Sequence, residues 1–136
     1  MAVVEFATHD DVAFLCQADA RNSKITIAEQ VARQEIIVAR LDGEVVGWLR
    51  LAYFWDSLPF MKDLHVVESH RGQGIGTAIV TFWEDQMRQR GHNRVMTSTM
   101  SSETAQHFYR KLGYTDVGGF VLPGEPLELM LWKRLN

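Results

Sequence analysis

The sequence predicts an α/β protein, because strand-like and helix-like segments alternate along its 136 residues. That length fits one domain, and we assign residues 1–136 to it. Hydrophobic residues make up 46% of the chain and charged residues 23%, as in ordinary globular proteins, so disorder is not expected.

The N-terminal half is expected to form four strands and two helices. Asp10 and Asp11 favour a helix start, because a carboxylate there can accept backbone N–H groups that lack partners. Asp42 and Gly43 indicate a tight turn between two strands. A loop is expected over residues 56–59. The predicted strands cover residues 3–6, 35–39, 44–53 and 60–67. Of the two predicted helices, the first begins near residue 9 and the second covers residues 25–33.

The C-terminal half is expected to add two helices and three strands. Gly91 ends a helix over residues 74–90, whose apolar side chains recur at helical spacing. Ser101 and Ser102 are expected to cap the next helix, which Gly113 ends. The predicted strands cover residues 94–99, 114–120 and 127–133.

Charge and cysteine content limit the classes of function. A net charge of -3 argues against a nucleic-acid partner, which would require a basic face. Cys16 is the one cysteine, which excludes an internal disulfide, favours a reducing, cytoplasmic setting and is expected to serve packing. The N-terminal residues do not resemble a signal peptide, and no apolar stretch approaches membrane-spanning length, so no membrane partner is expected. No residue is assigned to a metal site.

The segment from Arg71 to Thr77 connects a predicted strand to a predicted helix. Gly72, Gly74 and Gly76 remove side chains where a backbone must approach a ligand, and the first amides of a helix suit an anion. No lysine precedes Thr77, which excludes a P-loop, and a Rossmann turn would need glycine at position 77. The remaining pattern is R-x-x-G-x-G, which predicts a phosphate site unless the loop is only a tight turn packed on the sheet.

Three elements of the chain resemble the GNAT acetyltransferases. The stretch from Leu64 to Gly76 is similar to the family's motif A, Q/R-x-x-G-x-G/A after a strand. Residues 105–114, AQHFYRKLGY, resemble its motif B, and residues 44–51 resemble its E-x-V-G-x-x-x-L strand. The resemblance implies a mixed, splayed central sheet with helices on both faces, and the transfer of acetyl from acetyl-CoA to an amine.

By this resemblance, the cofactor lies where the strands at 60–67 and 94–99 diverge, and Tyr109 is the general acid that protonates the leaving thiolate. A phenol, with a reference pKa of about 10, is protonated at neutral pH and can donate to sulfur. Ser102 stands where the family often has asparagine, which puts that one contact in doubt. The residues implied to bind the cofactor are Leu64, Val66, Arg71, Gly72, Gln73, Gly74, Ile75, Gly76, Thr77 and Ser102.

The sequence leaves several alternatives for the general base and for the acceptor. Asp63, His65 and Glu68 are alternative bases, as is a water chain to a remote carboxylate. The resemblance places the acceptor near residues 19–28 and 119–125. An aromatic wall could come from Trp48, Phe54, Trp55 and Phe60, and the acidic Asp56 and Glu125 could attract a cation. In the alternative, these aromatic residues pack in the core or in a homodimer contact. We expect a small-molecule amine as acceptor. The alternatives are a protein lysine or N-terminus, or a non-catalytic acyl-CoA sensor.

Overall fold

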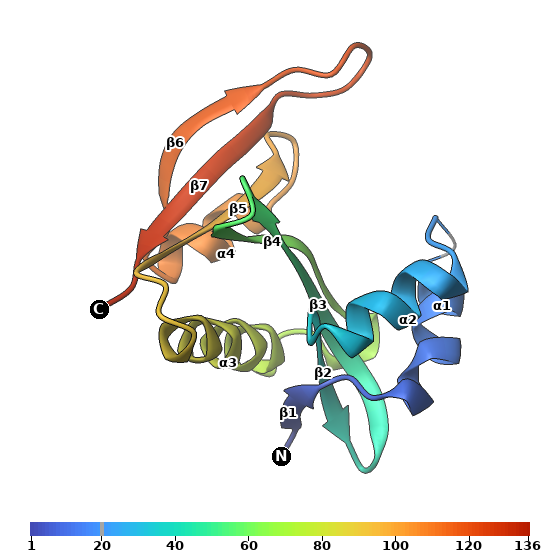
Figure 1. Cartoon of the computed structure of the whole chain (residues 1–136). Helices are drawn as coiled ribbons and strands as arrows, with labels where there is room; N and C mark the ends of the chain where they lie inside the picture. Colours follow the sequence, from blue (N-terminus) through green and yellow to red (C-terminus); the bar gives the residue numbers. More distant parts are fainter. Residues whose placement is uncertain (20) are drawn as a thin grey trace. The chain divides into compact units, whose positions relative to one another are not determined.

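The structure is a computed structural model that describes residues 1–19 and 21–136. Over these residues, the strands form a seven-stranded sheet in the order β1-β2-β3-β4-β5-β7-β6 (Figure 1). The β4–β5 pair is parallel, whereas β1–β2, β2–β3, β5–β7 and β6–β7 are antiparallel, so the sheet is mixed as predicted. The elements are β1 (Val3–Phe6), η1 (His9–Asp11), α1 (Val12–Ala18), α2 (Lys24–Ala32), β2 (Ile36–Leu41), β3 (Glu44–Phe54), β4 (Leu58–Val66), η2 (Glu68–His70), α3 (Ile75–Gln89), β5 (Arg94–Met100), α4 (Ala105–Lys111), β6 (Thr115–Phe120) and β7 (Glu128–Arg134).

The first of two compact units comprises Met1–Leu51 and Asp63–Trp83. Its strands alternate side chains between two faces, and the register places Val38 of β2 opposite Trp48 of β3. Both side chains belong to a buried cluster with residues of α1 and α2, the helices that lie beside these strands in Figure 1. The other members of this cluster are Ala7, Val12, Leu15, Ile27, Val31 and Ile36, and the half-buried Cys16 packs against it.

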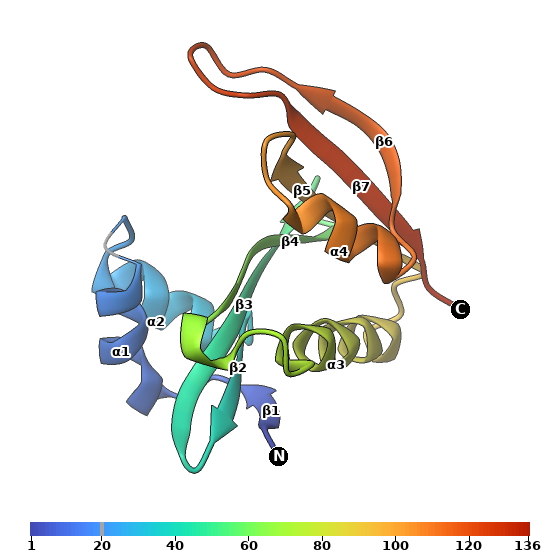
Figure 2. The same cartoon turned by 180° about the vertical axis from the view of Figure 1, so that it is seen from behind.

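The opposite face of this unit is covered by the first turns of α3. Gly47 of β3 permits this approach, since a Cβ there would lie 3.0 Å from Cδ1 of Ile79 and 3.0 Å from the carbonyl oxygen of His65. Phe6 of β1 packs edge-on against Phe82 of α3, with ring centroids 5.5 Å apart. Helices therefore lie on both faces of the sheet in this unit, as predicted (Figure 2).

The second unit comprises Ala52–Lys62 and Glu84–Asn136. Helix α4 lies on one face of β5 and β7 (Figure 2). In this unit, the buried carboxylate of Glu84 accepts hydrogen bonds from the Tyr114 hydroxyl at 2.8 Å and from Lys133 Nζ at 2.9 Å. Burial, together with the neighbouring Glu84 charge, raises the pKa of Tyr114. This buried polar group is therefore satisfied within the unit.

Of two turns predicted from the sequence, one is confirmed and the other is wrong at its end. Asp42 and Gly43 have φ values of 52° and 81°, the left-handed pair that the β2–β3 hairpin turn requires, so this prediction is confirmed. The loop predicted over residues 56–59 is wrong at its end, because β4 begins at Leu58. The turn is made by Trp55 and Asp56, with φ values of 51° and 62°. Turn rules do not place a tryptophan there, and proline is compatible with the first positions of a strand.

The prediction that Ser101 and Ser102 cap a helix is also wrong. Helix α4 begins at Ala105 with Thr104 as its N-cap residue, and the two serines lie in the turn before it. The carboxylate of Glu103 closes that turn by accepting the Met100 N–H at 3.2 Å. In the part of the chain that the structure describes, no helix combines the length and apolar character needed to cross a membrane.

Candidate functional site

The glycine-rich turn lies between η2 and α3 in the first unit. Gly72 and Gly74 have φ values of 77° and 81°, a region that side-chain-bearing residues rarely adopt. A Cβ at either glycine would meet no heavy atom within 4 Å, and residues 71–74 are exposed. The turn is therefore open to a ligand and is not filled by side chains of its own unit.

The amides that open α3 are the donors of this turn. The N–H of Ala78 donates to the carbonyl oxygen of Gly74 at 3.0 Å, so the N–H groups of Ile75, Gly76 and Thr77 precede the first bond of the helix ladder. Helix α3 is 15 residues long, and its dipole places partial positive charge at this end. Arg71 adds a full charge. Donors and charge together suit a phosphate.

A cavity of about 400 Å³ adjoins the same turn. Its lining joins the turn to the first residues of the chain and to the end of β2. The lining residues are Met1, Ala2, Leu41, Gln73, Gly74, Ile75 and Ala78. The predicted phosphate residues thus border a hollow of ligand size within one unit.

The end of β4 leads into the turn. The N–H of Val67 donates to the Val46 carbonyl at 2.9 Å, and because amides alternate along a strand, the Val66 N–H is directed away from β3. The carbonyl of Val66 accepts a hydrogen bond from Nε of the Arg71 guanidinium at 2.8 Å, which holds that group beside the strand. Leu64 and Val66 are half-buried, and this strand end supplies backbone groups beside the phosphate donors.

The three candidate bases occupy different surroundings. Asp63 accepts the indole N–H of Trp48 at 3.2 Å, and the His65 ring stacks on that indole with centroids 4.6 Å apart. Glu68 is exposed on η2. Asp63 and His65 line a cavity of about 330 Å³ together with Ala18, Asp19, Arg21 and Trp48. The structure therefore brings two of the three candidates to one cavity.

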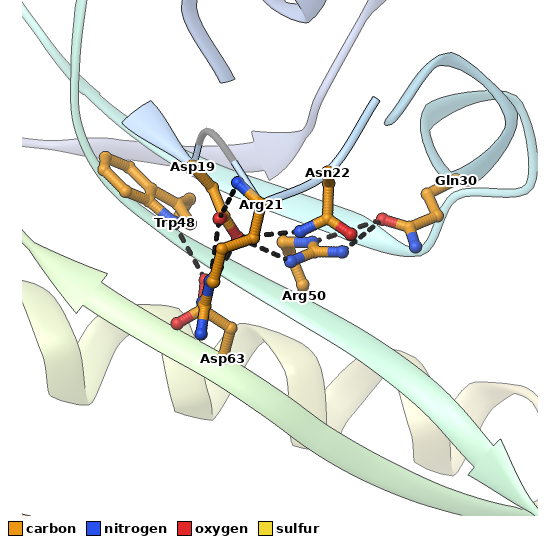
Figure 3. Close-up of polar contacts among 7 residues, drawn as sticks. All are labelled: Asp19, Arg21, Asn22, Gln30, Trp48, Arg50 and Asp63. Carbon is orange, nitrogen blue, oxygen red and sulfur yellow. Dashed lines mark hydrogen bonds and ion pairs between the residues drawn. The ribbon is translucent and has the colours of Figure 1, made fainter. Parts of the chain in front are cut away.

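A polar network lies beside this cavity (Figure 3). Asp19 follows α1 and accepts Nη1 of Arg50 at 3.0 Å, while Gln30 Oε1 accepts Nε and Nη2 of Arg50 at 3.2 and 3.0 Å. Asn22 also donates to Asp19, at 2.9 Å. Sequence reasoning missed Arg50 and Gln30. The available signal was a charge within the apolar run of β3, because a buried charge requires a partner.

The two arginines that bind Asp19 differ in burial. The side chains of Arg50 and Asp19 are only 6% and 10% exposed, so losing one partner of that pair leaves a buried charge at a cost of about 3–5 kcal/mol. Arg21 is 82% exposed, and such a surface ion pair contributes about 0–1 kcal/mol. The hydrogen bond from Arg21, with the nearby Arg50 charge, lowers the pKa of Asp19.

The remaining predicted residues lie in the second unit, apart from Trp48. Tyr109 is buried on α4, and its ring packs against Tyr114 with centroids 5.9 Å apart. Phe54 and Phe60 pack together at 4.8 Å, whereas Trp55 is 84% exposed at the hairpin tip. Asp56, Ser102 and Glu125 are exposed. The proposed aromatic wall is thus divided between the two units.

Comparisons with known proteins agree with this fold. The chain is 27% identical over 92 residues to a streptothricin acetyltransferase of Streptomyces lavendulae, a match covering 66% of the chain and 49% of that protein. The chain spans about half the length of the curated relatives it matches. Two solved structures share its fold. Ard1 from Thermoplasma volcanium has a TM-score of 0.84 at 15% identity, covering 99% of this chain and 98% of that one. The PaiA N-acetyltransferase from Thermoplasma acidophilum, in complex with coenzyme A, has a TM-score of 0.81 at 13% identity, covering 98% and 99%.

The family assignment follows from a model that spans the elements described above. The model of the acetyltransferase (GNAT) family matches residues 5–114, which include β2, the glycine-rich turn and the whole of α4. The resemblance seen in the three sequence elements is thereby confirmed, and the chain belongs to the GNAT acetyltransferase family.

Proposed function

We propose that this protein is an N-acetyltransferase that uses acetyl-CoA to acetylate a primary amine of a small molecule. The observation that carries the proposal is the open glycine-rich turn of this GNAT family member, where the free amides of α3 and the charge of Arg71 are suited to a phosphate. A solved structure of the same fold is described as a complex with coenzyme A, which supports this cofactor as the co-substrate.

The cofactor contacts follow from the donors of the first unit. The amides of Ile75, Gly76 and Thr77 and the guanidinium of Arg71 hold the pyrophosphate, while Gly72 and Gly74 leave room for it. The Val66 N–H, directed away from β3, is a donor for the pantetheine arm or the acetyl carbonyl. Ser102 keeps only its exposed hydroxyl as a possible cofactor contact, since it does not cap α4.

The reaction forms a C–N bond and breaks the C–S bond of the thioester. The amine attacks as the neutral form, because an ammonium has no lone pair, and its proton leaves to a base or water. Asp63 and His65 are the candidate bases that line a cavity. The thiolate that leaves takes a proton from the Tyr109 hydroxyl, a role that rests on the match of α4 to motif B.

The acceptor class rests on two observations. The name of the curated relative specifies streptothricin, a small molecule, as its acceptor. In this chain, the cavity beside Trp48 has a volume of about 330 Å³ and carries two carboxylates, Asp19 and Asp63, which favour a cationic small molecule.

The test is thiol release from acetyl-CoA across a panel of small amines, with a peptide panel for comparison. We expect turnover with small amines, and a loss of about 100-fold or more in kcat for Tyr109→Phe with unchanged CoA affinity. Tyr53→Phe is the matched control, because the Tyr53 hydroxyl contacts only Met87 and Arg90 among the interactions found in its unit. Full turnover by Tyr109→Phe would remove the acid assignment, and CoA binding without turnover on any amine would indicate a sensor.

A further inference from the structure

The cavity beside Trp48 is lined by a cationic side chain of the protein itself, that of Arg21. Arg21 donates to Asp19 from Nε at 3.0 Å and from Nη2 at 3.4 Å. Its side chain extends toward Asp63, with which it also interacts electrostatically (Figure 3). Arg21, Asp19 and Asp63 all line the cavity. The Arg21 guanidinium is therefore bound to one carboxylate of this hollow and directed toward the other.

Arg21 is not the one cation that compensates the negative charge of Asp19 among the described residues. The buried guanidinium of Arg50 binds the same carboxylate at 3.0 Å and is itself held by Gln30. Asp63 has a neutral donor, the indole of Trp48. With His65 counted as neutral, the two positive charges of the arginines, Arg21 and Arg50, balance the two negative charges of Asp19 and Asp63. If Arg21 moves away, the cavity wall carries one net negative charge.

Arg21 is also the member of this group that can move. Its side chain is 82% exposed, whereas those of Arg50 and Asp19 are 6% and 10% exposed. An exposed ion pair is weak because water screens it and because a long side chain loses conformational freedom in it. A solvated arginine can therefore yield its place to a ligand cation held inside the cavity.

On the basis of the proposed function, we propose that Arg21 is a specificity-determining residue that occupies the sub-site for a second positive charge of the acceptor. The acceptor is then an amine that bears a further cationic group. That group lies between Asp19 and Asp63 when the acceptor is bound, and the Arg21 guanidinium turns into solvent. Arg21 thus competes with acceptors that carry this second charge and leaves acceptors without it unaffected.

The test uses two primary amines of nearly the same shape, (2-aminoethyl)trimethylammonium, the charged probe, and its isostere 3,3-dimethylbutylamine, which lacks the quaternary charge. For Arg21→Ala, we expect KM for the charged probe to fall about fivefold, the ratio that corresponds to an exposed ion pair, with kcat unchanged. KM for the isostere should not change. Arg21→Lys should behave as the wild type, because the lysine keeps the competing charge. Arg33→Ala is the matched control, since Arg33 is an exposed arginine paired with Glu35 and absent from the cavity lining.

Two outcomes would overturn the inference while acetyl transfer persists: an unchanged KM for the charged probe in Arg21→Ala, or equal shifts for both probes. If the wild type acetylates neither probe nor any other amine, the proposed function fails, and calorimetry then decides the role of Arg21. Tighter binding of (2-aminoethyl)trimethylammonium to Arg21→Ala than to the wild type, and weaker binding to Asp63→Asn, would support it. Equal binding to all three forms would contradict it.

Discussion

The glycine-rich turn and the Asp19–Arg50–Gln30 network are both polar features of the first unit, but they are built in opposite ways. The turn is exposed, its donors come from the backbone, and its residues are consecutive from Arg71 to Thr77. The network is buried, its donors are side chains, and its three members come from the end of α1, from α2 and from β3. The turn is expected to bind without contributing much stability, whereas the network contributes stability and holds the wall of a cavity.

The largest expected effect is on the turn. Gly74→Glu should abolish CoA binding in calorimetry, because it places a carboxylate and a side chain beside the amides that we propose hold the diphosphate. Gly91→Glu is the matched control, since Gly91 also has a positive φ, of 90°, and open surroundings, and it follows the opposite end of α3. Unchanged affinity in Gly74→Glu would contradict the phosphate assignment, and equal losses in both variants would indicate a general effect on folding.

The network should show the opposite behaviour. Arg50→Ala should lower the free energy of unfolding by about 3–5 kcal/mol in denaturant titration, because it leaves the buried Asp19 carboxylate without its buried partner. The double variant Arg50→Met, Asp19→Leu should recover much of this loss, since it removes both charges together. A loss of less than 1 kcal/mol in Arg50→Ala would show that water reaches the pair, against the burial described here.

Sequence patterns predicted the turn because its chemistry is local. The spacing of Arg71, Gly74 and Gly76 specifies backbone geometry directly, as the pair Asp42 and Gly43 does for the β2–β3 hairpin. Alternating apolar residues likewise located the strands and helices to within a few residues, apart from the two turns described above. These features depend on neighbours along the chain, which a single sequence contains.

The network could not be predicted, because Gln30 and Arg50 are 20 residues apart and Asp19 and Arg50 are 31 apart. Only the antiparallel register of β2 with β3 and the packing of α1 and α2 bring them together. The role of Arg21 follows from the same tertiary arrangement. The charge of Arg50 within an apolar strand indicates that this residue needs a partner, but it does not indicate which one.

A smaller effect is expected from pH, through a second long-range pair. Arg40 binds both carboxylate oxygens of Asp11, at 2.8 and 2.7 Å, and this hydrogen bonding lowers the pKa of Asp11 in the folded protein. The stabilisation is present above the unfolded-state pKa of about 4 and is lost as pH falls through the lower folded-state value. The free energy of unfolding, measured from pH 6 to 2, should therefore fall below pH 4, and less steeply in Asp11→Asn. Identical slopes for the two proteins would exclude this contribution.

The central claim, that the opening amides of α3 bind the diphosphate of coenzyme A, is tested most directly by ¹H–¹⁵N NMR spectra of the wild type during addition of CoA. The amide signals of Ile75, Gly76 and Thr77 should shift strongly, and addition of pantetheine, which lacks the diphosphate, should leave them in place. If CoA binds while these three signals stay unchanged, the diphosphate lies elsewhere and the account is wrong.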